Sequence, residues 1–463
     1  MAGIGFELRR VLQRGGILRF LGVSLAGTAV VAGPWLLSVF GIFLIQRFAG
    51  LMLAESPLLF SATVVYCYAF SLMIFGGLHY SFTRQVSDLI YTDSKREAGS
   101  ALLSCMLLTL GVSAAIGAAC VLPLRLRGVI SHPELFIASA LVLFAAISLN
   151  WVLMSFISLL RSYTGILLVY LGSAVVSFGG VLLLGGRYAT GGALMGYALG
   201  QVFAVLVLYA MTLGRFRPSA ISLKGLFAAV GRHPYLFLAG LLYAWATWAE
   251  KVVFWFVFGT RVPGSWMRVF DPYDVPIFLA ILTLIPGLIY FTIETETAFY
   301  PRLREFLRAV GADSWQRIQE KKSAMIRSLL VGLREQSLLQ GIVSATLILL
   351  APMIGRAIFG PGVSAVTLRL TLAAVYLHSV FLGLMVFLFY FEFYDRALLS
   401  TLAFFAVNLA VSLPMALAGD TRLLGLSYIA GGAAGCAVAG AFLSRSIRSI
   451  DRTIFIRASG VGT

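Results

Sequence analysis

The chain has 463 residues, of which 60% are hydrophobic and only 12% are charged, and its formal net charge at pH 7 is +16. So few charged residues cannot cover the surface of a water-soluble protein of this length, which excludes an ordinary soluble globular fold. The four cysteines form no CxxC pair and the four histidines are widely separated, so we expect no disulfide framework, no metal site and no cofactor. The composition predicts an integral membrane protein.

The amino-terminal segment 1–16 is predicted to be amphipathic and cytoplasmic, with Ile4, Leu8, Val11 and Leu12 on one helical face. The apolar run that follows is too long for the central region of a signal peptide, and no clear small-residue cleavage site follows it. We therefore expect a retained transmembrane helix at the start of the chain.

About twelve apolar segments are close to the roughly 20 residues that a helix needs to cross a bilayer. Their length and the absence of alternating polarity exclude strands, and helices satisfy every backbone hydrogen bond within lipid. The predicted fold class is an all-α integral membrane protein with two six-helix bundles. The predicted spans are 17–46, 58–83, 98–123, 135–160, 164–186, 191–214, 233–258, 274–298, 336–359, 364–391, 397–418 and 423–444.

Two charged connections divide these spans into six and six. We predict an N-terminal bundle over residues 17–214 and a C-terminal bundle over 233–444, joined by a cytoplasmic linker over 215–232. The C-terminal bundle contains an amphipathic cytoplasmic insert at 299–335, and a cytoplasmic tail covers 445–463. Internal symmetry of this kind is common in transporters.

The lysine and arginine residues predict the orientation. Roughly 25 of them fall on the side of the two termini and roughly 8 on the other side, which places both termini in the cytoplasm. A nucleic-acid-binding protein would instead carry basic residues among aromatic ones on a solvated domain, and no such domain is predicted.

The insert 299–335 contains two amphipathic helical patterns. Leu303, Phe306, Leu307 and Val310 recur at helical spacing, and a second pattern begins at Trp315 after the break GADS. Both pieces are typical of helices that lie on an anionic lipid surface. They anchor the topology or dock a cytosolic partner, and the pattern leaves both alternatives open.

Two Gly-Pro combinations interrupt predicted spans. Gly33 and Pro34 lie in the first span, and Pro286 and Gly287 lie in the eighth. Proline removes a backbone hydrogen bond and kinks a helix, so these four residues are candidate hinges. Kinks serve bundle motion or simple packing, and both interpretations stay open.

The seventh span contains adjacent opposite charges, Glu250 and Lys251. A charge at the bilayer centre costs about 2.5–3.5 kcal/mol on insertion scales, so such residues usually face a cavity or a partner. Neighbouring residues on a helix point about 100° apart, so the two charges are poorly placed to pair only with each other. We expect Lys251 to lie beside Trp248 and Glu250 to face a polar interior, and all three residues are candidates for the substrate path. The alternative for Glu250 is a structural ion pair, for which Arg369 is one possible partner.

Four further polar residues are candidates for the substrate path. Glu294 and Glu296 lie near the cytoplasmic end of the eighth span, where pairing with arginine or contact with water is the alternative role. Asn150 and His378 lie within spans, where hydrogen bonding between helices is the more common role.

Several stretches resemble the PelG family, the Pel exopolysaccharide transporters of the bacterial inner membrane. They are MAGIGFELRRVL, GPWLLS, TRQVSDLIY, EKVVFWF, YDVPIFLAILTLIPGLIYFTIETETAFY and YFEFYDRALL, and the similarity covers nearly the whole chain. The family is similar to MATE exporters and oligosaccharide flippases, which implies two bundles around a central cavity. It also implies an N-acetylhexosamine polymer as substrate and PelD, PelE and PelF-like synthase subunits as partners.

The expected function is translocation of this polysaccharide from a cytosolic glycosyltransferase to the periplasm. No nucleophile–base pair or phosphate-binding loop is visible in the sequence, so we expect a transporter and not an enzyme. The alternatives are an ion-coupled small-molecule exporter of MATE type, with Glu250 as the ion site, and a scaffold that holds the synthase without transport.

Overall fold

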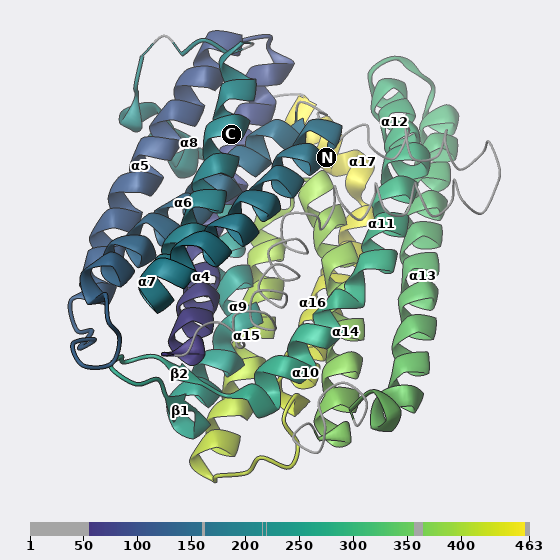
Figure 1. Ribbon diagram of the computed structural model, residues 1–463. Helices are drawn as coiled ribbons and strands as arrows, with labels where there is room; N and C mark the ends of the chain where they lie inside the picture. Colours follow the sequence, from purple (N-terminus) through teal and green to yellow (C-terminus); the bar gives the residue numbers. More distant parts are fainter. Residues whose placement is uncertain (1–54, 160–162, 215, 219, 356–363, 459–463) are drawn as a thin grey trace, which may run out of the picture. The chain divides into compact units, whose positions relative to one another are not determined.

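The computed structural model is almost entirely helical (Figure 1). It describes residues 55–159, 163–214, 216–218, 220–355 and 364–458. The predicted amphipathic segment 1–16, the first predicted span and its candidate hinge residues Gly33 and Pro34 lie outside these ranges.

Ten helical stretches of the described chain are long and apolar enough to cross a membrane, and they coincide with predicted spans. One of them, α7 (Tyr163–Leu213), has 51 residues. A straight helix of that length would extend about 76 Å, far beyond the roughly 30 Å of the hydrocarbon core. Its backbone leaves the helical conformation at Tyr188 and Ala189, where φ of Ala189 is +48°. Because this kink falls between the predicted spans 164–186 and 191–214, the ten helices supply eleven of the predicted spans.

The two halves of α7 pack directly on each other. The Ser173 hydroxyl donates to the carbonyl of Gly200 at 2.7 Å. A Cβ atom added to Gly196 would lie 2.1 Å from the carbonyl carbon of Gly180, so only glycine allows the backbones to approach this closely. α7 is therefore a helical hairpin held by small residues, as is common in membranes.

Packing groups the chain into two compact units, Ala32–Phe270 and a second one that contains Asp271–Thr463. We call their described parts the N-terminal and C-terminal units and treat each by itself. The N-terminal unit contains α4 (Pro57–Tyr91), α5 (Lys95–Val121), α6 (Pro133–Leu159), α7, α8 (Leu223–Arg232), α9 (Pro234–Phe258), β1 (Thr260–Arg261) and β2 (Arg268–Val269). The C-terminal unit contains α10 (Asp271–Leu282), α11 (Leu284–Glu294), the π-helix η1 (Thr295–Phe299), α12 (Tyr300–Ala312), α13 (Trp315–Ile354), α14 (Ala365–Tyr390), α15 (Tyr394–Leu417), α16 (Leu426–Arg448) and α17 (Ile450–Ala458).

In the N-terminal unit, α4 contacts every other helix, including α9. A Cβ on Gly76 would lie 2.9 Å from that of Ala244, and a Cβ on Gly240 would lie 2.6 Å from the Tyr80 ring. These small residues let α4 and α9 pack closely, so α9 belongs by packing to the N-terminal unit. The structural boundary after Phe270 thus differs from the predicted linker at 215–232, and the predicted division into moving bundles stays a prediction.

A short antiparallel β-hairpin follows α9 and was not predicted. β1 and β2 pair Thr260 with Val269 and Arg261 with Arg268. The Tyr66 hydroxyl of α4 donates to the carbonyl of Arg268 at 2.9 Å and accepts from its backbone N–H at 3.1 Å. This hairpin lies between two spans and is too short for sequence periodicity to reveal.

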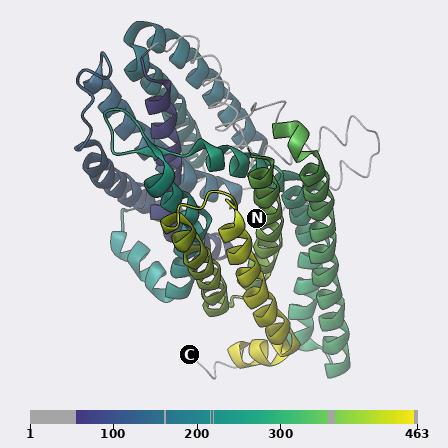
Figure 2. The ribbon, with the colours of Figure 1, turned by 90° about the horizontal axis from the view of Figure 1, so that it is seen from below.

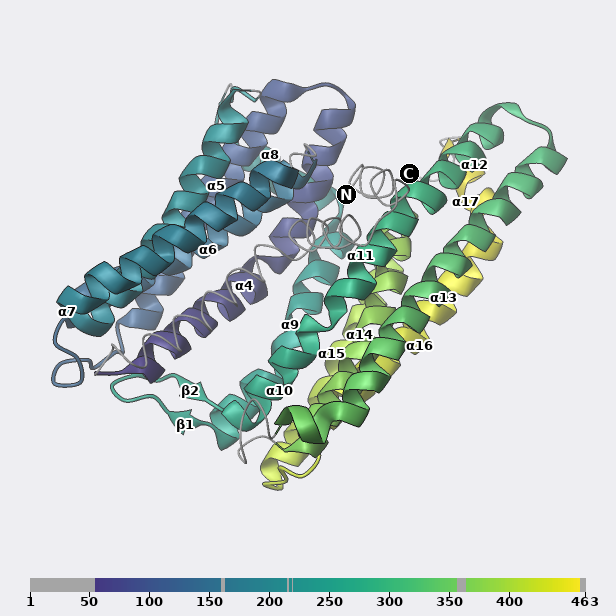
Figure 3. The same ribbon diagram turned by 45° about the vertical axis from the view of Figure 1, so that its right-hand side comes forward.

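In the C-terminal unit, α13 is longer than predicted. It runs without interruption for 40 residues, beside α12 and α14 (Figure 3). Forty residues extend about 60 Å, twice the hydrocarbon thickness, so the half that precedes the predicted span projects from the membrane. The expectation that residues 315–335 form a separate helix lying on the lipid surface is therefore wrong, because they continue as one helix into the span that follows.

The projecting half of α13 packs with α12 and contacts α17 at the C-terminal end of the described chain (Figure 2). Lys322 and Asp451 form an ion pair at 3.0 Å, with only 10% and 13% of their side chains exposed. Lys322 also donates to the carbonyl of Arg448 at 2.6 Å, and Gln319 donates to Asp451 at 3.0 Å. Burial alone would raise the pKa of Asp451, but the hydrogen bonds from Gln319 and Lys322 hold it below its usual value.

We expect Asp451→Asn to release α17 from α13. The change leaves Lys322 largely buried without its carboxylate, which should cost on the order of 2 kcal/mol, below the roughly 3–5 kcal/mol of a fully buried pair. Hydrogen exchange of the α17 amides measures this opening. Because the folded pKa of Asp451 is lowered, the wild-type contribution is complete above the ordinary carboxyl value of 3.8 and is lost as the pH falls through the folded pKa.

The control is Asp313→Asn. Asp313 pairs with Arg317 at 3.6 Å, but the side chains are 34% and 71% exposed, so this pair should contribute little. Equal exchange rates in both variants would contradict a stabilising role for the Lys322–Asp451 pair.

Candidate functional site

The structure distributes the predicted site residues over the two units. Asn150, Trp248, Glu250 and Lys251 lie in the N-terminal unit. Pro286, Gly287, Glu294, Glu296 and His378 lie in the C-terminal unit, as does Arg369, which donates its Nε–H to the carbonyl of Ile348. Each group is therefore described within its own unit.

Glu250 lies on a fully buried stripe of α9. Its side chain and those of Ala246 and Phe254, one turn before and after it, are each 0% exposed. A carboxylate in such a place is stable only when neighbouring charges or hydrogen-bond donors compensate for its lost hydration. Since solvent does not reach Glu250 in this conformation, contact with a transported molecule requires the protein to open.

Lys251 has a different environment from Glu250. Its Nζ lies 4.3 Å from the centroid of the Trp248 ring and donates to the carbonyl of Thr247 at 3.3 Å. The Trp248 and Trp255 rings lie 5.9 Å apart, so the ammonium lies beside an indole pair. A desolvated cation over an indole gains about 2 kcal/mol, which offsets part of the cost of burial. The expectation that Lys251 lies beside Trp248 is confirmed.

Asn150 joins two helices. Its side-chain amide on α6 donates to the backbone carbonyl and to the side-chain oxygen of Gln201 on α7, at 3.2 Å each. The Asn150 oxygen is buried, and no hydrogen-bond donor among the described residues reaches it. The residue therefore stabilises packing between helices, and its role in a substrate path stays a prediction.

The two glutamates of the IETE stretch lie at a change of helix type. Glu294 ends α11, and Glu296 lies in the π-helical turn η1. Glu296 is 3% exposed and interacts electrostatically with Tyr390 of α14, whereas Glu294 is only half-buried and packs near Gly332 of α13. The π turn was not predicted, and such turns occur frequently at functional sites.

His378 joins α14 to α16 through a hydrogen bond between its Nδ1 and the Tyr428 hydroxyl. Two glutamines of α13 extend this polar interior: Gln336 donates to the carbonyl of Ser379 at 2.9 Å, and Gln340 donates to Thr283 at 3.3 Å. Sequence reasoning missed these glutamines, although Gln336, Gln340 and Ser344 recur at every fourth residue and so share a helix face. Within the described ranges, no group of three His, Cys, Asp or Glu side chains could hold a metal ion.

The predicted kink of the eighth span lies at Thr283, between α10 and α11. Pro286 occupies the first turn of α11, where a missing N–H breaks no intrahelical bond. A Cβ on Gly287 would lie 2.8 Å from the Gln340 side-chain oxygen, so this glycine allows close packing on α13. The structure thus accounts for both residues by local geometry, and their role as hinges stays a prediction.

Comparison with known proteins gives a family and a fold. The family described as "PelG: Putative exopolysaccharide Exporter (EPS-E)" matches residues 1–455. No protein with curated annotation matches the chain.

Solved structures with similar folds include transporters of the MATE family and of the MOP superfamily. An outward-facing multidrug resistance MATE transporter of the MOP superfamily has a TM-score of 0.58 and 16% identity, covering 92% of this chain and 97% of that one. The Vibrio cholerae MATE transporter VcmN in its bent form has a TM-score of 0.60 and 13% identity, covering 93% and 98%. A MOP superfamily transporter from Pyrococcus furiosus has a TM-score of 0.55 and 15% identity, covering 92% and 96%. The predicted all-α membrane fold of MATE type is confirmed.

Proposed function

Because the chain belongs to the PelG family of exopolysaccharide exporters, we propose that it moves a growing polysaccharide across the bacterial inner membrane. The family match over residues 1–455 is the observation that carries this proposal. The MATE-like fold supports it, since the solved structures with this fold are transporters. The polymer would be the N-acetylhexosamine chain that the resemblance to the Pel transporters implies.

The proposed orientation places both termini, α12, α17 and the projecting half of α13 in the cytoplasm, because the basic residues concentrate there. These three helices would then face the cytosolic machinery that makes the polymer. PelD, PelE and PelF-like synthase subunits are the proposed partners.

Glu250 is the proposed polar contact for the polymer within the membrane. A buried carboxylate accepts strong hydrogen bonds, and sugar hydroxyl and acetamido groups supply the donors. Because Glu250 is fully buried, this contact would need a path that opens for each transport step. Lys251 would hold the α9 face in place through Trp248, while Glu294 and Glu296 would act at the cytoplasmic end of the path.

The test is the location of the polymer in cells that lack this chain but keep the synthase. We expect polymer to disappear from the medium and to accumulate inside, with recovery when the chain is restored. The ion-coupled alternative predicts normal polymer export together with increased sensitivity to small toxic cations. The scaffold alternative predicts that synthesis itself stops, so that polymer is missing on both sides.

A further inference from the structure

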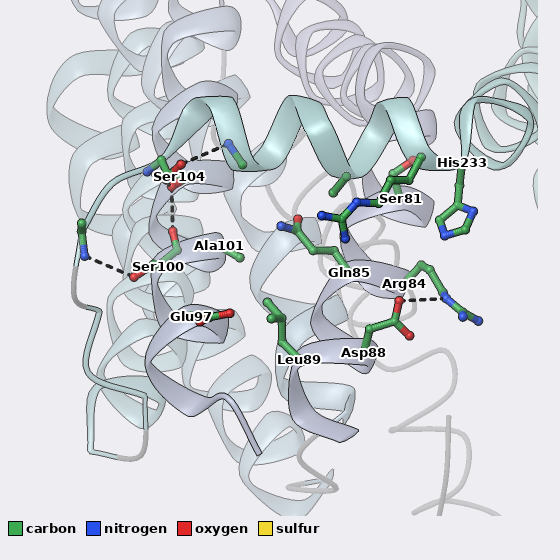
Figure 4. A pocket seen from close by; sticks show the side chains of 15 residues that line it. Ser81, Arg84, Gln85, Asp88, Leu89, Glu97, Ser100, Ala101, Ser104 and His233 are labelled. Carbon is green, nitrogen blue, oxygen red and sulfur yellow. Dashed lines mark hydrogen bonds and ion pairs between the residues drawn. The ribbon is translucent and has the colours of Figure 1, made fainter. Parts of the chain in front are cut away.

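A polar cleft of about 420 Å³ lies within the N-terminal unit, between α4, α5 and α8 (Figure 4). Its volume falls in the range of about 300–1,000 Å³ that small-molecule sites occupy. None of the residues predicted for the substrate path lines it. On the orientation proposed above, it opens at the cytoplasmic side, where α4 ends and α5 begins.

The walls of the cleft are held in place by hydrogen bonds between segments far apart in the sequence. The Ser104 hydroxyl of α5 accepts from the backbone N–H of Ser222 at 2.9 Å, and the Ser100 hydroxyl accepts from that of Ala220 at 3.3 Å. Ser222 caps α8 by accepting from the N–H of Gly225 at 3.0 Å. α8 is thus fastened to α5, and the cleft is a built feature of the unit.

Two polar atoms in the α4 wall are buried without a hydrogen-bond partner among the described residues. They are the hydroxyl oxygen of Ser81, whose side chain is 3% exposed, and the amide oxygen of Gln85. Figure 4 shows Gln85 directed into the space between α4 and α5. A buried acceptor of this kind costs about 1–3 kcal/mol until a donor reaches it, so these atoms favour a ligand with hydroxyl or amide donors.

The charges in the cleft are balanced. Arg84 and Asp88 pair with each other at 3.2 Å on one wall. Glu97 and Arg232 also line the cleft, and neither forms an ion pair with a described residue. The two guanidinium groups and the two carboxylates of these four side chains together give no net charge.

We infer that this cleft binds an uncharged sugar unit of a glycan, which on the proposed function is a segment of polymer that enters the transporter. Sugar hydroxyls can donate to the Glu97 carboxylate and the Gln85 amide oxygen and accept from the Arg232 guanidinium. A phosphate group fits less well, because two carboxylates oppose it and the serine cap occupies the N–H of Gly225 at the start of α8.

The test uses saturation-transfer NMR to measure the binding of chitotetraose, a neutral tetrasaccharide, to the purified full-length chain in detergent. We expect saturable binding to the wild type. Glu97→Gln and Gln85→Ala should each weaken it about tenfold, the effect of losing one hydrogen bond of about 1.4 kcal/mol. Glu97 is exposed, so its replacement leaves the fold intact.

The matched control is Glu134→Gln. Glu134, like Glu97, is an exposed glutamate in the first turn of a long helix, but it does not line the cleft. Glu134→Gln should leave the binding of chitotetraose unchanged. Equal binding by wild type, Glu97→Gln and Gln85→Ala would overturn the inference, and so would a loss of binding in Glu250→Gln alone or no binding at all.

Inorganic phosphate is the second probe, and the sign of the Glu97→Gln effect separates the two ligand classes. Removing a carboxylate weakens the binding of a neutral sugar but tightens the binding of an anion. Saturable phosphate binding to the wild type, tightened by Glu97→Gln, without any binding of chitotetraose would overturn the inference. This assay measures binding in solution, whereas the proposed function is tested by polymer location in cells. If chitotetraose does not bind to the cleft, the proposed export function is unaffected. If the chain proves unnecessary for export, the measured binding to the cleft is unaffected.

Discussion

Cells carrying Glu250→Gln should retain the polymer inside while the protein reaches its normal level in the membrane. Glutamine has nearly the same volume as glutamate, so packing of the buried α9 stripe is kept. The charge is lost, and with it a charge-assisted hydrogen bond of about 1.5–3 kcal/mol to a passing sugar, which corresponds to about tenfold to hundredfold slower export. Polymer inside and outside the cell, together with membrane protein level, measures the effect.

Glu335→Gln is the control, because Glu335 is an exposed glutamate on α13. Cells carrying this variant should export the polymer normally. Normal export by Glu250→Gln would remove Glu250 from the path. Loss of the Glu250→Gln protein from the membrane would instead favour the alternative in which Glu250 forms a structural ion pair.

Gly196→Ala should strongly destabilise the N-terminal unit. The added Cβ would lie 2.1 Å from the Gly180 carbonyl carbon, and because the obstacle is backbone, the two halves of α7 must separate. Overpacking of well-packed cores typically costs about 1–3 kcal/mol, and a backbone clash belongs at or beyond the upper end. A lower melting temperature of the purified protein in detergent is the expected result.

Gly179→Ala in the same hairpin should have the opposite effect and stabilise the N-terminal unit. A Cβ on Gly179 meets nothing within 4 Å, so alanine should gain about 0.5–1 kcal/mol from its better helix propensity. Similar melting temperatures for the two variants would contradict the close packing of the α7 hairpin.

Local patterns predicted the eleven spans that lie within the described residues. The kink at Tyr188 and Ala189 separates two spans that hydrophobicity had already separated. The different environments of Glu250 and Lys251 followed from the 100° step of a helix, and Lys251 lies beside Trp248 as expected. The resemblance to the PelG family is likewise confirmed.

The structural features that the sequence did not predict share a physical cause. Residues 315–335 are amphipathic because α13 packs with α12 and α17 there, and the same pattern would serve a helix on lipid. The π turn around Glu296 adds no change in hydrophobicity, so no periodicity reveals it. The placement of α9 depends on Gly76 and Gly240, whose contact joins residues more than 160 positions apart.

The sequence by itself determined the membrane class, the spans and the proposed orientation, because hydrophobicity and charge act on segments of about 20 residues without reference to the rest of the chain. Only the tertiary structure decided which helices share a unit, how Lys322 meets Asp451, and that α4, α5 and α8 enclose a polar cleft. Those features depend on side chains from distant segments meeting at atomic distances, and such complementarity exists only after the helices have packed.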